Sequence, residues 1–258
     1  MTSSIWLSLP CASQRPAAGA RPSAPDLHRS ATMFNGDYSL TPPLFSDRRA
    51  AGRELARHLR HLADGVDLVV LGLPRGGVPV AYEIARDLNA PLDVFVVRKL
   101  GLPGHEEFAM GAIASGGIRI MNEDLTRSYQ LPDAMVDAVT QKERSELERR
   151  ERTYREGRPP LTVKGRVVIL VDDGLATGST MKAAVGAVRQ LQPARVVVAV
   201  PVCAADTCEA LSEIADEVVC PYRPEPFRAV GRWYEDFSAT ADAEVTELLH
   251  SVEVAPGV

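Results

Sequence analysis

Two adjacent carboxylates stand before a run of small and hydroxyl-bearing residues in the second half of the chain. The acids are Asp172 and Asp173. The run consists of Ala176, Thr177, Gly178, Ser179 and Thr180. Small side chains let backbone N–H groups approach a phosphate closely, and hydroxyls add hydrogen-bond donors. Because carboxylates accept hydrogen bonds from sugar hydroxyls, the pattern predicts a site for a ligand with a phosphate at one end and a diol at the other.

A strand and a helix must hold this loop in place. Residues 167–171 are the most apolar run in the chain, which is typical of a strand buried on both faces of a parallel sheet. A helix is expected over about residues 180–191. Its positive N-terminal end would face the same phosphate as the loop.

Two other phosphate motifs fail on spacing. A Walker A loop needs four residues between its glycines, followed by lysine, but Gly174 and Gly178 are separated by three residues and Ser179 comes next. Neither glycine-rich turn of the chain contains the G-x-G-x-x-G pattern of dinucleotide-binding proteins. A dinucleotide-dependent oxidoreductase would have a suitable fold class, but the fingerprint that it needs is missing.

The rest of the chain alternates between predicted strands and predicted helices. Strands are expected at residues 67–73, 92–97, 195–200 and 217–220, with two short ones within 112–121. Helices are expected from a cap at Ser46 or Asp47 to Leu62, and over residues 78–88, 132–155, 205–214 and 241–250. A loop should follow Lys99 as far as Glu107. This order predicts an α/β fold with a mainly parallel central sheet flanked by helices, and ligands at the carboxyl ends of its strands.

At this point the chain resembles a known family. Residues 167–180 read Val-Val-Ile-Leu-Val-Asp-Asp-Gly-Leu-Ala-Thr-Gly-Ser-Thr, which is similar to the phosphoribosyl pyrophosphate (PRPP) motif of type I phosphoribosyltransferases. Residues 73–77, Leu-Pro-Arg-Gly-Gly, resemble the pyrophosphate-binding loop of that family. Residues 97–104 resemble the start of its flexible catalytic loop, and both segments are most similar to adenine-type members. The resemblance covers roughly residues 45–220.

The resemblance implies a reaction and a set of roles. The 5-phosphoribosyl group of PRPP would pass to a nitrogen base, with release of pyrophosphate. Lys99, Asp172 and Asp173 would be catalytic, and Mg²⁺ would lie near the two aspartates, held through ribose hydroxyls or water. The substrate-binding residues would be Arg75, Gly76, Gly77, Arg98, Ala176, Thr177, Gly178, Ser179 and Thr180.

Departures from the family pattern leave the acceptor base open. Hypoxanthine-guanine members carry an aspartate at the position of Ala176, whereas adenine and uracil members have alanine there. Adenine-type members have a glutamate in the flexible loop, where this chain has Ala109. Gly174 stands where the family prefers a larger apolar residue. A non-catalytic sensor of PRPP or nucleotides with the same fold is the alternative function.

Composition and charge exclude some other classes. The chain has 258 residues with a net charge of -5, so no basic excess points to nucleic acid as a partner. No apolar run is long enough to cross a membrane. The cysteines, Cys11, Cys203, Cys208 and Cys220, include no C-x-x-C pair, so we expect small buried thiols in a reducing cytoplasm and not a metal site.

The domain boundaries follow from composition. Residues 10–30 are rich in Ala, Pro, Ser and Arg, a composition that cannot bury a core, and residues 1–40 should form a disordered extension. Residues 41–258 should form the phosphoribosyltransferase domain, with a small C-terminal hood over about residues 221–258. The sequence does not give the oligomeric state, and a homodimer stays open.

Overall fold

The most apolar strand lies at the centre of the main sheet, as the sequence predicts. The computed structural model describes residues 42–63 and 66–252, and every element below belongs to the unit that begins at Pro43. The extension predicted for residues 1–40 lies outside the described residues. β6 (Val167–Val171) is buried along its whole length.

All strand pairs of this five-stranded sheet are parallel. The remaining strands are β1 (Leu68–Gly72), β2 (Leu92–Val94), β7 (Arg195–Ala199) and β8 (Glu217–Val219), and the order is β2-β1-β6-β7-β8. Successive β6 side chains alternate between two hydrophobic cores: Ile169 lies in one, and Val168 and Leu170 lie in the other. The uninterrupted apolar sequence of β6 is therefore explained by cores on both faces.

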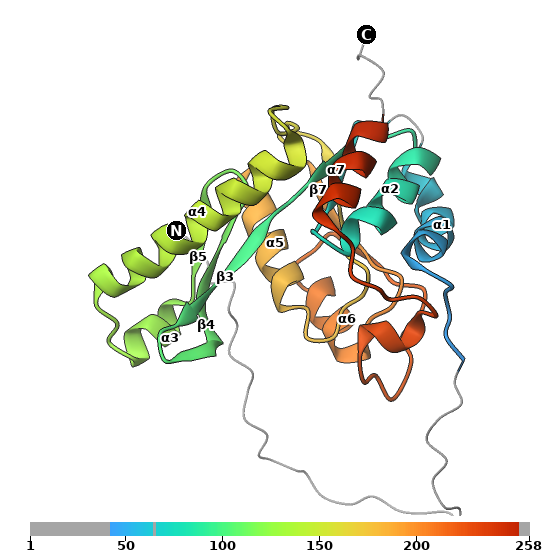
Figure 1. The fold of residues 1–258 in the computed structure, drawn as a ribbon. Helices are drawn as coiled ribbons and strands as arrows, with labels where there is room; N and C mark the ends of the chain where they lie inside the picture. The colour runs from blue at the N-terminus through green and yellow to red at the C-terminus, as the bar shows by residue number, and fades with distance from the viewer. Residues whose placement is uncertain (1–41, 64–65, 253–258) are drawn as a thin grey trace, which may run out of the picture. The chain divides into compact units, whose positions relative to one another are not determined.

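Helices cover both faces of this sheet (Figure 1). Three of them lie side by side over the Ile169 face: α1 (Arg48–Leu59), α2 (Gly77–Asp87) and α7 (Asp242–Ser251). The other face is covered by α5 (Ser179–Gln190) and α6 (Ala205–Ser212). Asp47 caps α1, as expected, by accepting a hydrogen bond of 2.7 Å from the Ala50 N–H. A short 3₁₀ helix, η1 (Arg60–Leu62), follows α1.

The strand predicted over residues 92–97 is wrong in its extent, because the chain changes sheets inside the apolar run. β2 ends at Val94, and the Phe95 N–H still donates to Gly72 O of the parallel sheet at 3.0 Å. The Val96 N–H instead donates to the Ser115 hydroxyl at 2.9 Å. Two consecutive residues are thus hydrogen-bonded to two different sheets.

The loop predicted after Lys99 is also wrong, since most of it is a hairpin. β3 (Val97–Leu102), β4 (His105–Ala114) and β5 (Ile118–Met121) form a second, antiparallel sheet. The sequence identified the β4–β5 turn at Gly116–Gly117, but it gave β4 too few residues. A short helix that was not expected, α3 (Glu123–Ser128), follows β5.

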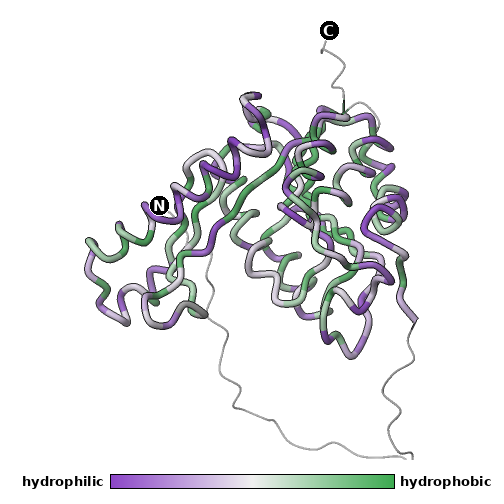
Figure 2. Tube along the Cα trace, viewed as in Figure 1, coloured by the Kyte–Doolittle hydropathy of each residue, from purple (hydrophilic) through white to green (hydrophobic). Residues whose placement is uncertain are grey.

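The long helix predicted near residues 132–155 is confirmed as α4 (Asp133–Arg155). Hydrophilic residues recur along it in Figure 2, and its buried side chains are limited to Thr140, Leu147, Tyr154 and Arg155. The charged face is thus solvated, as its mixed charges predict. No helix among residues 42–63 and 66–252 combines the length and apolar character that crossing a membrane requires.

Candidate functional site

The predicted phosphate loop emerges from the carboxyl end of β6. Asp172 and Asp173 follow directly after the strand, and α5 begins at Ser179. Leu175 anchors the loop to the neighbouring segment, because its N–H donates to Val202 O at 3.0 Å and its carbonyl accepts from the Ala204 N–H at 3.0 Å.

The side chains of the loop that could bind a phosphate face solvent. Ala176, Thr177, Ser179 and Thr180 are exposed, whereas Gly178 between them is buried. The Thr177 and Ser179 hydroxyls lie 3.2 Å apart, so both can serve one ligand. Hydroxyls and the N-terminus of α5 meet here, which is the arrangement that binds anions.

The second glycine-rich turn packs directly against the two acids. A Cβ on Gly76 would lie 2.0 Å from Asp173 Oδ2, and one on Gly77 would lie 2.5 Å from Val171 O. At such distances a side chain at either position would force neighbouring atoms to shift. The turn that includes Arg75 and the loop that begins at Asp172 therefore form one continuous surface at the carboxyl edge of the sheet. The peptide bond between Pro74 and Arg75 is cis.

The acid pair is electrostatically strained. Burial and the neighbouring Asp173 carboxylate raise the pKa of Asp172 well above its ordinary value. Burial also raises the pKa of Asp173, although a hydrogen bond from Arg48 acts in the opposite direction. Arg48 Nε donates to Asp173 Oδ2 at 2.7 Å, and less than a sixth of either side chain is exposed. A ligand that brings positive charge or hydroxyl donors would relieve this strain.

The C-terminal segment reaches the same acids. The Tyr234 hydroxyl donates to Asp173 O, and burial raises the pKa of that hydroxyl. The Arg48 guanidinium lies 3.9 Å from the centre of the Phe237 ring, and Arg48 Nη1 donates to Ser238 O at 2.7 Å. The site thus joins the first residue of α1 to residues near the end of the described chain.

The packing around Gly174 explains why a glycine occupies this position. Its φ is +155°, and a Cβ would lie 2.6 Å from Val230 and 3.0 Å from Val202. The space that a larger apolar residue would occupy is filled by Val230 of the C-terminal segment. Trp233 and Tyr234 of that segment are buried in a small core with Phe45.

The basic residues predicted to bind pyrophosphate are more dispersed. Arg75 is half exposed, and its nearest acidic oxygen is Asp242 Oδ1 at 3.9 Å. Lys99 lies on the exposed side of β3, and β3 belongs to the smaller sheet. Arg98 donates to Glu143 of α4, with Nε at 2.9 Å. The structure therefore brings the acids, the phosphate loop and the glycine turn together, and places Arg98 and Lys99 on the hairpin.

The family model for the phosphoribosyl transferase domain matches residues 47–229. The chain belongs to this family. Two curated relatives, named "Putative phosphoribosyl transferase Rv0571c" and "Putative phosphoribosyl transferase MT0597", come from two strains of Mycobacterium tuberculosis. Each is 49% identical over 206 residues, which is 80% of this chain and 46% of the relative. The chain thus spans about half the length of the curated relatives it matches. The crystal structure of TT1426 from Thermus thermophilus is 46% identical with a TM-score of 0.72, and the match covers 80% of this chain and 97% of that one.

Two parts of this phosphoribosyl transferase site were not predicted from the sequence. Arg48 gave a weak signal: it stands in the first turn of a helix, where acidic residues are favoured and cations are not. That position suggests that its charge has a partner elsewhere, but the partner, Asp173, is 125 residues away in the chain. The Tyr234 hydroxyl gave no signal of its bond to the Asp173 backbone.

Proposed function

We propose that this protein transfers the 5-phosphoribosyl group of PRPP to a nitrogen base and releases pyrophosphate. The observation that carries the proposal is the contact between the Gly76 turn and the Asp173 carboxylate, beside the exposed Thr177–Ser179 hydroxyls. The phosphate site and the two diol acceptors follow β6, and the second backbone turn follows the neighbouring strand β1, so they would take the 5-phosphate, the ribose and the pyrophosphate of PRPP in that order.

Each part of the ligand would have its own partner. The 5-phosphate would take the loop from Ala176 to Thr180 and the N-terminus of α5. The ribose hydroxyls would donate to Asp172 and Asp173. The pyrophosphate would lie against the backbone of Gly76 and Gly77, with the Arg75 guanidinium beside it. Such positioning stabilises positive charge at ribose C1 as the leaving group departs.

Magnesium fits the chemistry of the acids. Asp172 and Asp173 offer carboxylate oxygens, which Mg²⁺ prefers, and because burial raises the pKa of both carboxyl groups, a cation beside them would stabilise their charged forms. These two residues would hold the ion through the ribose hydroxyls or water. When bound, the ion would neutralise the pyrophosphate.

The hairpin would supply the remaining positive charge. Lys99 is on β3, next to the exposed Pro103–Gly104 turn, and its neighbour Arg98 is tied to α4 through Glu143. We assign Lys99 the role of stabilising the departing pyrophosphate when the hairpin covers the site, which would also exclude water. Arg98 would position this hairpin against α4, and any contact that it makes with substrate would require it to leave Glu143.

The proposal does not assign the identity of the acceptor base. Ala176 offers no carboxylate to a purine, so a 6-oxopurine is disfavoured. The Tyr234 hydroxyl donates to Asp173 O, and Ser238 O accepts from Arg48, so we expect the segment that includes Tyr234 and Ser238 to lie beside the acceptor.

The decisive measurement is pyrophosphate release from PRPP and magnesium across a panel of purine and pyrimidine bases. Lys99→Ala should lower turnover by roughly 10- to 1,000-fold, with a smaller effect on PRPP affinity, because the charge acts mainly on the leaving group. Lys164→Ala is the matched control, since that exposed lysine precedes β6 at the opposite end of the strand. If the wild type binds PRPP but releases no pyrophosphate with any base, the proposed enzyme function is wrong and the protein is a sensor of PRPP.

A further inference from the structure

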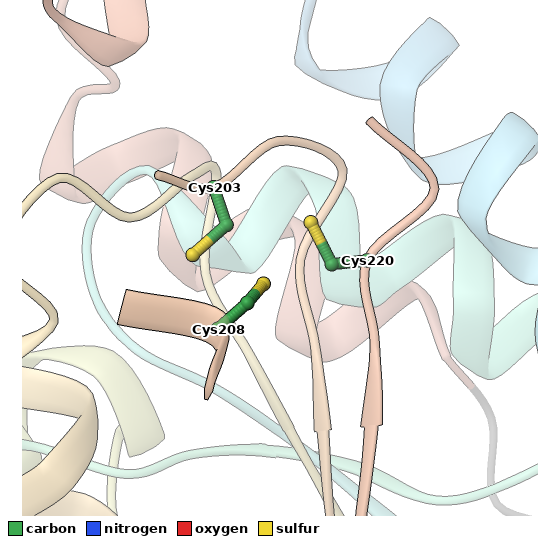
Figure 3. A group of neighbouring side chains, drawn as sticks. All are labelled: Cys203, Cys208 and Cys220. Carbon is green, nitrogen blue, oxygen red and sulfur yellow. The ribbon is translucent and has the colours of Figure 1, made fainter. Parts of the chain in front are cut away.

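Three cysteines from separate segments meet beside the phosphate loop. Cys203 follows β7, Cys208 lies in α6 and Cys220 follows β8. Their sulfur atoms all lie within 4.8 Å of one another, and Figure 3 shows the three side chains gathered in one place. The sequence spacing does not match a metal motif. The parallel sheet creates the cluster, because the carboxyl ends of neighbouring strands lie at the same edge.

We propose that Cys203, Cys208 and Cys220 bind a thiophilic d¹⁰ cation, with Zn²⁺ as the representative ion. Thiolates are the ligands that select such ions. With zinc–sulfur bonds of ~2.3 Å, two sulfurs of a tetrahedral site lie ~3.8 Å apart, so the cluster needs to contract by no more than ~1 Å. Binding would convert three thiols and Zn²⁺ into a zinc tris-thiolate and three released protons.

The surroundings suit this ion. Three thiolates and one Zn²⁺ leave a charge of minus one, and Arg223 supplies positive charge near Cys208 and Cys220. Cys203 and Cys208 are buried, whereas Cys220 is partly exposed and offers an entry path. Three protein ligands leave a fourth position for water.

A disulfide accounts for the cluster less well. It would use two of the sulfurs, bring them to ~2.05 Å and leave the third thiol unexplained. Each of the three sulfurs lies within 4.8 Å of both others. A shared ion requires this arrangement, and a disulfide does not.

The cluster is connected to the phosphate loop through the backbone. Cys203 pairs with Leu175 in a parallel bridge. Thr207, the residue before Cys208, donates from its hydroxyl to Ala176 O at 2.6 Å. An ion that holds Cys203 and Cys208 together would therefore stabilise the phosphate loop at Leu175 and Ala176. Hydrogen exchange at the amides of residues 175–178 should slow when the metal is bound, a readout that does not depend on the proposed reaction.

The test uses the full chain, reduced and freed of metal, titrated with Cd²⁺ as a spectroscopic probe and then with Zn²⁺. We expect one Cd²⁺ per chain with thiolate-to-metal charge-transfer absorption, displacement by Zn²⁺, and a higher melting temperature with either ion. Cys220→Ser should weaken binding by at least ~100-fold, more than the loss of an outer-shell partner does. Cys203→Ser and Cys208→Ser should act alike, and circular dichroism would check that each variant is folded.

Two controls separate this site from others. Cys11→Ser removes the remaining thiol of the chain, which precedes the described residues, and should leave the absorption unchanged. Asp172→Asn with Asp173→Asn removes the carboxylate site and should also leave it unchanged, because carboxylates give no such band. The proposal is overturned if Cd²⁺ produces no thiolate band in the wild type, if Cys220→Ser binds as tightly as the wild type, or if dissolved oxygen promptly oxidises two of the three thiols to an internal disulfide in the presence of Zn²⁺.

Discussion

Replacing Gly76 with alanine tests the geometry on which the site depends. Gly76 has φ -62° and ψ -30°, so an alanine would adopt the backbone without strain. The added methyl would instead lie 2.0 Å from Asp173 Oδ2 and 3.0 Å from Arg48 Nε. Because an ordinary carbon–oxygen contact is ~3.5 Å, the carboxylate or the turn must move by ~1.5 Å. That movement separates Arg48 from Asp173, which are 2.7 Å apart.

The size of the effect follows from these contacts. Overpacking costs ~1–3 kcal/mol, and a lost charge-assisted hydrogen bond costs ~1.5–3 kcal/mol. Since relieving the clash is what breaks the bond, we expect a total of ~2–4 kcal/mol, which lowers the melting temperature of a domain of this size by ~5–15 °C. PRPP affinity should fall as well, because the turn and the acids would no longer form one surface.

Thermal unfolding followed by circular dichroism, together with calorimetric titration with PRPP and magnesium, measures both effects. Gly157→Ala is the control: its φ is +86° and no atom lies within 4 Å of the added methyl, so it adds only backbone strain of ~1–2 kcal/mol. It should leave PRPP affinity unchanged. If Gly76→Ala melts like the wild type and binds PRPP equally well, the close approach of turn and acids does not exist.

Two further predictions concern buried charge. Because the pKa of Asp172 is raised in the folded state, its contribution to stability is present below the ordinary carboxyl pKa of ~3.9 and is lost as pH rises through the raised pKa. The melting temperature of Asp172→Asn should therefore rise relative to that of the wild type as pH increases above ~4. If the melting temperatures of the two proteins change with pH in parallel, this prediction is wrong. Arg155, whose Nε lies 2.9 Å from Asp93 Oδ1, is buried with its partner, so Arg155→Met should cost ~3–5 kcal/mol of unfolding free energy in denaturant titrations. Adding Asp93→Asn should recover part of that loss, and a double variant no more stable than the single one would refute the pairing.

The parts of the fold that the sequence predicted are those specified by neighbouring residues. β6 and its loop could be located because the apolar run, the two acids and the small residues are contiguous. The cap at Asp47 and the long helix α4 were predictable for the same reason, since caps and charge patterns act over one or two helical turns.

The sheet switch could not be predicted in this way. Residues 92–97 are nearly all apolar, and nothing within the run distinguishes Val94, which ends β2, from Val96. The difference is made by the Ser115 hydroxyl, a residue of the β4–β5 turn that becomes a partner only after the hairpin has formed. The turn at Pro103–Gly104 carried a recognisable signal, but pairing between β3 and β4 depends on contacts across the hairpin that spacing alone does not reveal.

The charge arrangement around Asp173 shows why the remaining site residues also escaped prediction. Arg48 Nε binds the Asp173 side chain, while the Tyr234 hydroxyl binds its backbone carbonyl. These partners come from opposite ends of the described chain, and the Glu235 N–H donates to Phe45 O at 2.8 Å to hold the two ends together. The strand end can therefore support two adjacent carboxylates only after both ends have folded onto it.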